Sequence, residues 1–182
     1  HKKNKTSQQF PNGLVYLLPD EFTNYNDSHI GIKAIELLNS LGYEVILVDI
    51  FESGRTYISK GLIRTAKRIA NRNIEKLKDF ISDETPLIGI EPSAILSFRD
   101  EYPDLALSHN KQAAIKLAKN ALLFEEFFMR EVEKGNIKKE QFKEQNISIK
   151  LHGHCQQKAV ASTIPTKAML SFPNGYNVTE IP

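Results

Sequence analysis

Apolar and polar residues alternate along the chain with two periods, one typical of strands and one typical of helices. Short apolar runs predict five strands, at residues 15–18, 44–50, 86–90, 147–151 and 176–181. Apolar residues at helical spacing predict four longer helices, at residues 28–41, 63–81, 111–134 and from after 157 to about 170. Ser28 is the expected N-cap of the first helix, and Pro165 must kink or divide the last one.

The order of strand, loop, helix and strand, without adjacent hairpins, predicts an α/β fold with a parallel-rich sheet flanked by helices. Right-handed crossovers place the loops that follow the strands at one edge of such a sheet, where open α/β sheets bind ligands. We expect four loops to converge there, at residues 20–27, 51–61, 91–99 and 152–157.

A weak internal repeat accompanies this order. Gly42-Tyr43-Glu44-Val45 recurs as Gly175-Tyr176-Asn177-Val178, and the same offset of 133 positions carries the first predicted strand onto residues 148–151. The sequence therefore predicts two related strand–loop–helix–strand copies, the second of them incomplete.

Composition and charge narrow the classes of function. The chain has 182 residues, 41% of them hydrophobic, which suits one domain with a sizeable core or two small halves. The net charge is +2 with acidic and basic residues interspersed, so we expect no nucleic-acid partner. The single cysteine excludes a disulfide framework, and no apolar run approaches the roughly 18 residues of a transmembrane segment. Residues 1–12 begin with a polar, lysine-rich stretch that we interpret as a linker or cloning junction.

The loop around Cys155 holds the densest cluster of candidate metal ligands. His152, His154 and Cys155 offer imidazole and thiolate groups, which suit zinc or iron. A structural metal usually needs four protein ligands, and this loop has three at most, crowded together in sequence. The alternative is that Cys155 is a small buried residue and both histidines are satisfied locally.

Two further loops carry charged and small residues of potential chemical use. Gly54, Arg55, Ser59 and Lys60 precede a helix and form a candidate anion-binding loop, with a tight turn bearing solvated charges as the alternative. Glu91 ends a strand, and it could serve as a general base, accept backbone amides, or pair with Arg99 or Arg55. No catalytic triad or pair of carboxylates is recognisable, so we assign no catalytic residue.

Five runs of residues follow one another in an order that resembles a known family. They are 20–26, 53–62, 90–93, 98–105 and 152–159. Together they resemble the cysteine-rich "CCG" domain family, whose members include one of the subunits of heterodisulfide reductase, the iron–sulfur subunit of glycolate oxidase and the small subunit of anaerobic glycerol-3-phosphate dehydrogenase. The resemblance is strongest to the C-terminal region of fused FAD/FMN-containing dehydrogenases of the FAD-linked oxidase type.

The resemblance implies iron–sulfur ligand positions, most of which have lost their cysteine. In the first copy, over residues 13–140, the expected cysteines fall on Glu21, Glu52, Ser53 and Ala94. In the second copy, over residues 141–182, only the opening Cys155 is present, and its Cys-Cys-Gly would lie beyond Pro182. Because several thiolates hold such a cluster, we expect none in this chain alone. FAD and a 4Fe–4S cluster are expected only in a full-length parent.

The resemblance also implies a function. The chain would be the electron-transfer region of an FAD-linked dehydrogenase or oxidase that acts on a 2-hydroxy acid such as lactate or glycolate, without catalysis of its own. Its partners would be the flavin domain of the same polypeptide or complex and an electron carrier. The expected location is cytoplasmic, with or without peripheral attachment to the inner membrane through the parent. The alternative is a non-redox module that uses the degenerate scaffold for docking or for binding a small anion.

Overall fold

The computed structural model describes residues 10–50 and 52–181, which form two compact units. The units divide between Leu123 and Phe124. The division between copies expected at residue 140 stays a prediction, and residues 1–9, Phe51 and Pro182 lie outside the described residues.

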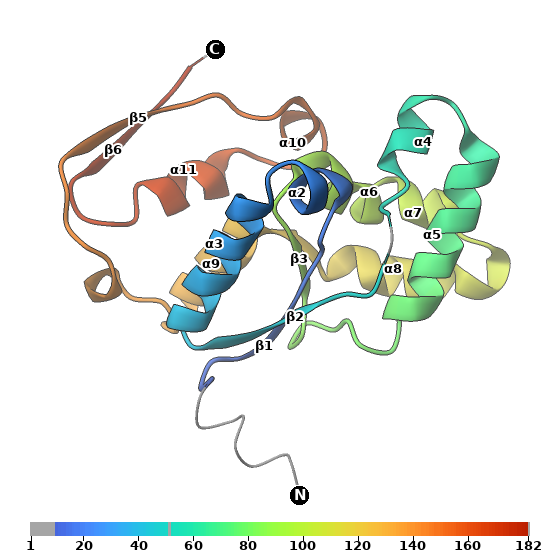
Figure 1. Cartoon of the computed structure of the whole chain (residues 1–182), viewed down its shortest axis with the longest axis horizontal. Coiled ribbons are helices and arrows are strands. Elements are labelled where there is room, and N and C mark those ends of the chain that lie inside the picture. Colours follow the sequence, from blue (N-terminus) through green and yellow to red (C-terminus); the bar gives the residue numbers. More distant parts are fainter. Residues whose placement is uncertain (1–9, 51, 182) are drawn as a thin grey trace, which may run out of the picture. The chain divides into compact units, whose positions relative to one another are not determined.

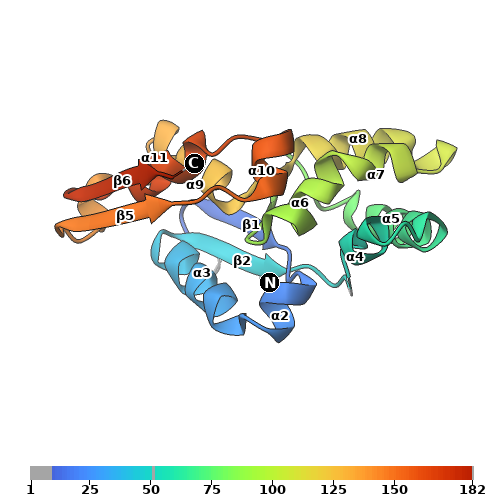
Figure 2. The same ribbon diagram turned by 90° about the horizontal axis from the view of Figure 1, so that it is seen from above.

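The first unit is built on a parallel four-stranded sheet in the order β2-β1-β3-β4. Its strands are β1 (Gly13–Leu17), β2 (Tyr43–Leu47), β3 (Leu87–Gly89) and β4 (Ala121–Leu123). Its helices are α2 (Glu21–Tyr25), α3 (Ser28–Ser40), α4 (Arg55–Ser59), α5 (Ile63–Leu77), α6 (Pro92–Arg99), α7 (Glu101–Leu105), the 3-10 turn η1 (Ser108–Asn110) and α8 (Lys111–Lys119). Figure 1 shows α3 alongside β2, and Figure 2 shows α2 and α3 on one side of β1 and β2. The α/β class with a parallel sheet and flanking helices is confirmed.

The core of this unit includes residues of the two inner strands and of α6 and α7. Val15 of β1 and Leu87 and Ile88 of β3 are fully buried. Phe98 and Tyr102 are also fully buried, with ring centroids 4.2 Å apart. Strands buried on both faces carry continuous apolar runs, which is why the sequence pattern located them.

The second unit contains α9 (Phe124–Glu133) and a two-stranded parallel sheet of β5 (Ile147–Leu151) and β6 (Tyr176–Glu180). Between these strands lie α10 (Cys155–Val160) and α11 (Ile164–Leu170), and a 3-10 turn η2 (Lys139–Gln141) precedes them. Pro165 divides the predicted helix by standing in the first turn of α11, where its missing N–H costs no hydrogen bond.

Four local predictions are wrong. The helix expected over residues 111–134 is interrupted by β4, because Ala121–Leu123 pairs with β3 and the Asn120 carbonyl accepts from the Leu87 amide. The loops expected at residues 20–27 and 51–61 contain the short helices α2 and α4, and the loop expected at residues 91–99 is almost wholly the helix α6. The N-cap of α3 is Asp27, and Ser28 is the first helical residue. The loop at 152–157 follows a strand of the second sheet, so it does not share a sheet edge with the other three loops.

The internal repeat is visible in the two parallel strand pairs, although their registers differ by one residue. Gly13 of β1 lies opposite Tyr43 of β2, and Ile147 of β5 lies opposite Tyr176 of β6. The glycine before each second strand, Gly42 or Gly175, has a positive φ of 86° or 82°. Both units therefore contain a parallel strand pair whose second strand follows a glycine in the left-handed conformation.

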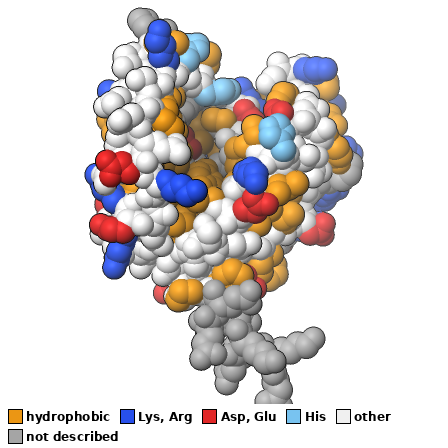
Figure 3. All heavy atoms as spheres, turned by 60° about the vertical axis from the view of Figure 1, so that its left-hand side comes forward, with side chains coloured by type: hydrophobic (Ala, Val, Ile, Leu, Met, Phe, Trp, Pro, Cys, Tyr) orange, Lys and Arg blue, Asp and Glu red, His pale blue; other side chains and the backbone are white. Residues whose placement is uncertain are grey.

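Charges of both signs lie on the surface, and α5 is strongly basic. On the face shown in Figure 3, Lys and Arg side chains are interspersed with Asp and Glu. Helix α5 differs, because it carries five Lys or Arg residues and a single acidic residue, Glu75. This basic helix was not expected from the overall charge. None of the described helices is both long and apolar enough to cross a membrane.

Candidate functional site

The loops after β1 and β2 are joined by a carboxylate and a serine at two of the expected cysteine positions. The Asp20 carboxylate caps α2 by accepting from the amides of Phe22 and Thr23, at 2.9 and 2.8 Å, and thereby sets Glu21 in the first turn. Glu21 Oε1 accepts from the Ser53 amide at 2.7 Å, and the Ser53 hydroxyl lies 2.9 and 3.1 Å from the two carboxylate oxygens. Residues 32 positions apart are thus held together at the carboxyl edge of the sheet.

Buried side chains of Asn73 and Tyr102 hydrogen-bond to the backbone of the loop that contains Ser53. The Tyr102 hydroxyl donates to the Ser53 carbonyl at 2.7 Å, and the Asn73 side-chain amide donates to the Glu52 carbonyl at 2.8 Å and to Tyr102 Oη at 2.9 Å. Burial raises the pKa of the Tyr102 phenol far above its usual range. Tyr102 therefore stays a neutral donor, and the backbone of residues 52–53 is fixed by both contacts.

Gly54 allows this loop to turn into α4. Its φ is +83°, a left-handed backbone conformation that residues other than glycine rarely adopt. A Cβ at this position would lie 3.2 Å from Ile69 Cγ2. The turn directs the Arg55 amide to the Ser53 hydroxyl at 3.2 Å. Glycine at this position is thus required both by backbone conformation and by close packing.

Arg55 is committed to an internal ion pair. Its Nη1 lies 2.6 Å from Glu101 Oε1 of α7, and both side chains are largely buried. Burial raises the pKa of the Glu101 carboxyl, and it outweighs the Arg55 guanidinium, which favours the charged form. Ser59 and Lys60 are exposed at the far end of the five-residue α4. The residues of the expected anion-binding loop therefore do not form one group, because Arg55 binds Glu101 whereas Ser59 and Lys60 face solvent at the end of α4.

Glu91 anchors the helix that follows β3. Its carboxylate is the N-cap of α6 and accepts from the Ala94 amide at 2.6 Å and from the Ser93 hydroxyl at 2.8 Å. Ala94, the fourth expected cysteine position, is 3% exposed. Arg99, at the end of α6, donates to the Ala121 carbonyl of β4 at 2.9 Å. Glu91 and Arg99 thus tie the two ends of α6 to its surroundings.

In the second unit, the three candidate ligands lie around the start of α10. Cys155 is its first residue, and His154 is its N-cap, with Nδ1 accepting from the Gln156 amide at 3.2 Å. Cys155, His152 and His154 are all exposed, so the thiol is not the buried residue of the alternative interpretation. Over residues 10–50 and 52–181, no group of three or more His, Cys, Asp or Glu side chains could hold a metal ion.

Glu21 and Cys155 occupy corresponding positions when β1 and β5 are aligned at their first residues, Gly13 and Ile147. Each is the eighth residue after the first residue of its strand, β1 or β5, and each opens the helix that follows. The preceding residue caps that helix with its side chain in both units, Asp20 in one and His154 in the other. The geometry therefore relates the one thiol of the chain to the carboxylate that binds Ser53.

The residues present do not fit an iron–sulfur cluster. Ala94 has no donor atom, and the oxygens of Glu21 and Ser53 are already bonded to each other. Cys155 supplies a single thiolate, whereas such clusters are held by several.

The sequence pattern missed the residues that hold the loop together. Asn73 lies on the buried face of α5, and Tyr102 belongs to a run that the resemblance includes, but neither signals its hydrogen-bonding role. The same is true of Gln157, whose buried amide donates to Glu125 Oε1 at 2.8 Å and to Thr166 Oγ1 at 2.7 Å within the second unit. A buried asparagine or glutamine inside an apolar face is the one local signal for such roles.

Comparison with known proteins finds distant relatives over part of the chain. D-2-hydroxyglutarate dehydrogenase of Haemophilus influenzae is 28% identical over 93 residues, which cover 51% of this chain and 9% of the relative. The enzyme of the same name from Pseudomonas putida is 26% identical over 144 residues, covering 79% of this chain and 13% of the relative. One of the subunits of the anaerobic glycerol-3-phosphate dehydrogenase of Escherichia coli is 29% identical over 92 residues, covering 50% of this chain and 23% of the relative.

No family model and no solved structure matches the chain. The chain spans about a tenth of the length of the hydroxyglutarate dehydrogenases and about a quarter of the length of the glycerol-3-phosphate dehydrogenase subunit. It is therefore similar to a small part of two kinds of dehydrogenase.

Proposed function

We propose that this chain is the electron-transfer region of an FAD-linked 2-hydroxy acid dehydrogenase in which the first iron–sulfur ligand set has been replaced by a structural hydrogen bond. The parent would oxidise a 2-hydroxy acid at a flavin in another domain and pass electrons to a carrier. The matched relatives include dehydrogenases named for D-2-hydroxyglutarate, which is itself a 2-hydroxy acid. A cytoplasmic location stays a prediction.

One observation carries the proposal. Glu21 and Ser53, two positions where the resemblance expects cysteines, lie within hydrogen-bonding distance although 32 residues separate them. Loops that once shared a cluster must converge, and removal of the cluster leaves polar groups there that need new partners. The Glu21–Ser53 bonds meet that need and keep the two loops joined without metal.

The second unit supports the same interpretation. Cys155 stands where Glu21 stands in the first unit, and it is exposed. It could ligate a cluster only together with cysteines outside this sequence. The anion-binding alternative is weaker, because Arg55 has Glu101 as an internal partner.

The test is to restore the lost ligands. A variant with Glu21→Cys, Glu52→Cys, Ser53→Cys and Ala94→Cys is reconstituted anaerobically with ferrous iron and sulfide. We expect bound iron, acid-labile sulfide and a broad visible absorbance that bleaches on reduction. The wild-type chain and a variant that keeps Ala94 but carries the other three changes serve as controls, and both should bind markedly less iron.

Two results would contradict the proposal. One is a folded four-cysteine variant, with the circular dichroism of the wild type, that binds no cluster. The other is a cluster in the wild-type chain. Adding Cys155→Ala to the four-cysteine variant should leave its cluster in place, because Cys155 belongs to the other unit.

A further inference from the structure

The outward face of α5 carries a row of cations. Arg64, Arg68, Arg72 and Lys76 recur at every fourth position, and all four are exposed. Four residues slightly exceed one helical turn of about 3.6, so the row winds slowly around the helix toward its C-terminal end. Lys67 lies beside the row and is also exposed.

Little acidic charge neutralises this row. Within the described residues, Arg64, Lys67, Arg68 and Arg72 form no ion pair. Glu75, the one acid of α5, is bound by Lys78 and lies 3.8 Å from His109. A charged face normally mixes both signs, so this one leaves an excess of positive charge along about 12 Å of helix, from Arg64 to Arg72.

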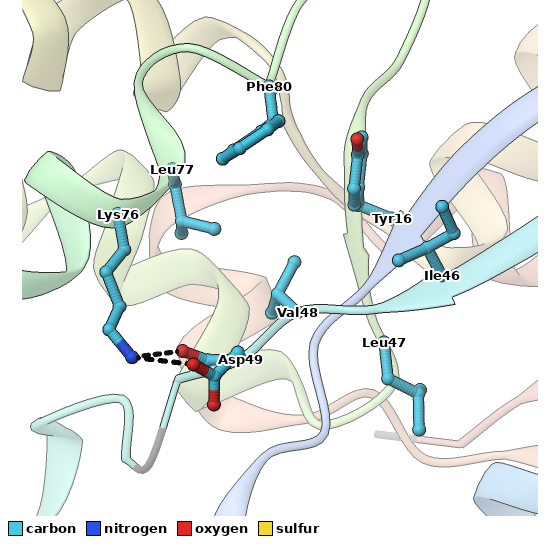
Figure 4. Close-up of a pocket in the computed structure, with 8 residues that line it drawn as sticks. All are labelled: Tyr16, Ile46, Leu47, Val48, Asp49, Lys76, Leu77 and Phe80. Carbon is cyan, nitrogen blue, oxygen red and sulfur yellow. Dashed lines mark hydrogen bonds and ion pairs between the residues drawn. The ribbon is translucent and has the colours of Figure 1, made fainter.

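An apolar groove adjoins the C-terminal end of the row. It encloses about 400 Å³ between β2, the end of α5 and the segment that follows. The lining residues are Tyr16, Ile46, Leu47, Val48, Asp49, Lys76, Leu77 and Phe80. Figure 4 shows Lys76 and Asp49 paired at one end, with the Phe80 and Tyr16 rings on the other side. Lys76 thus belongs to both the cation row and the groove.

The groove is open because β2 is the outer strand of its sheet. Ile46 is 39% exposed, Leu47 53% and Phe80 57%. Large apolar side chains that gather around a concavity, with charges along one side, are characteristic of an interaction surface. A pocket of this volume accommodates one large apolar side chain together with its flanking backbone.

We propose that the α5 cation row and this groove form a docking surface for an acidic polypeptide segment that carries one large apolar side chain. The carboxylates of the partner would lie along Arg64, Arg68 and Arg72, and its apolar side chain would enter the groove beside Phe80. Charge complementarity favours an acidic partner, and the apolar concavity favours a polypeptide over nucleic acid, whose phosphates would leave the groove unused. The docking surface does not depend on the proposed electron-transfer origin.

The first test measures charge. A fluorescein-labelled peptide of alternating glutamate and glycine, with one central phenylalanine, is titrated with the full chain at low salt, and anisotropy is recorded. We expect saturable binding that weakens as salt rises, and at least about a tenfold loss of affinity in Arg68→Glu/Arg72→Glu. Lys116→Glu/Lys119→Glu is the matched control, because both lysines are exposed on α8 and the net charge changes equally. It should weaken binding by less than about twofold.

The second test measures the groove. Replacing the peptide's phenylalanine by alanine should weaken binding to the wild-type chain by about tenfold. Phe80→Ala removes an exposed side chain that lines the groove. In this variant, the same change in the peptide should weaken binding much less, because the contact between the two phenylalanine rings is already absent. Circular dichroism confirms that each variant is folded.

Three outcomes would overturn the proposal. The first is equal weakening by the α8 control. The second is a peptide phenylalanine whose contribution is the same in wild type and Phe80→Ala. The third is tighter binding of a single-stranded DNA oligonucleotide or of phosphatidylserine vesicles, dependent on Arg68 and Arg72, which would assign the row to a different class of partner.

Discussion

Two carboxylates beside the loop at residues 52–55 show how local contacts decide the behaviour of an acid. Both oxygens of Glu21 accept from Ser53. In Glu101 one oxygen binds Arg55, while Oε2 is buried without a hydrogen-bond partner among the described residues. Desolvation of that second oxygen disfavours the charged form, and this explains why the pKa of Glu101 is raised despite the adjacent cation.

The raised pKa of Glu101 predicts a pH dependence of stability. In the window between the ordinary glutamate pKa of about 4.3 and the raised value, the folded state binds more protons than the unfolded state. The stabilising contribution of Glu101 is therefore complete below this window and falls as pH rises through it. Urea unfolding at a series of pH values should show the free energy of unfolding of the wild type, minus that of Glu101→Gln, decreasing through the window.

Asp104→Asn is the matched control for this measurement. Asp104 lies on the same helix, α7, and its side chain is 91% exposed. In Asp104→Asn, the free energy of unfolding should change with pH in the same way as in the wild type. A difference between wild type and Glu101→Gln that grows with pH would contradict the assignment.

At the scale of elements, the two halves of the internal repeat share a left-handed glycine in the turn before β2 and before β6. Gly42 and Gly175 both take positive φ values, but their surroundings differ. A Cβ on Gly175 would lie against the Gln145 carbonyl oxygen, inside van der Waals contact, whereas Gly135 has a similar φ of +78° and open space around it. A comparison of Gly175 with Gly135 therefore separates the cost of backbone strain from the cost of a steric clash.

Gly175→Ala should destabilise the second unit more than Gly135→Ala. Each substitution costs about 1–2 kcal/mol for the left-handed conformation. At Gly175 the clash with backbone should add roughly a further 1–3 kcal/mol, on the order of an overpacked core site. Chemical denaturation followed by circular dichroism measures both. Equal losses would mean that the Gln145 backbone moves away freely.

At the scale of the whole molecule, the two sheets differ in how completely their strands are paired. β1 lies between β2 and β3, so it is hydrogen-bonded on both sides. β5 pairs only with β6 within the part of the chain that the structure describes, and no residue of either strand is fully buried. Two-stranded sheets gain less from packing and open more readily.

Hydrogen exchange should follow this difference. We expect the amides of β1 and β3 to be among the slowest to exchange, and those of β5 and β6 to exchange at least about tenfold faster. Mass spectrometry of peptides that cover each strand measures both rates in one experiment. Slower exchange in β5 and β6 than in β1 would show that the second sheet is protected by contacts other than strand pairing.

The sequence by itself located most of the elements. Apolar runs marked β1, β2 and β3, because buried parallel strands need continuous hydrophobic residues, and apolar residues at alternate positions marked the more exposed β5 and β6. Helical spacing marked α3 and α5, and the Gly-Tyr pairs marked the repeat. It also suggested that the loops after β1 and β2 belong to one site, since strand order alone brings the carboxyl ends of parallel strands to one edge.

Only the tertiary structure decided which groups meet. Apolar periodicity over residues 111–134 fits a helix, and β4 formed there because β3 offered an unpaired edge. Likewise, the Glu21–Ser53 bonds, the Arg55–Glu101 pair and the adjacency of Lys76 to an apolar groove join residues far apart in the chain. Local patterns fix the face on which a side chain lies, whereas hydrogen bonds and charge interactions depend on distances that the packing of the elements alone sets.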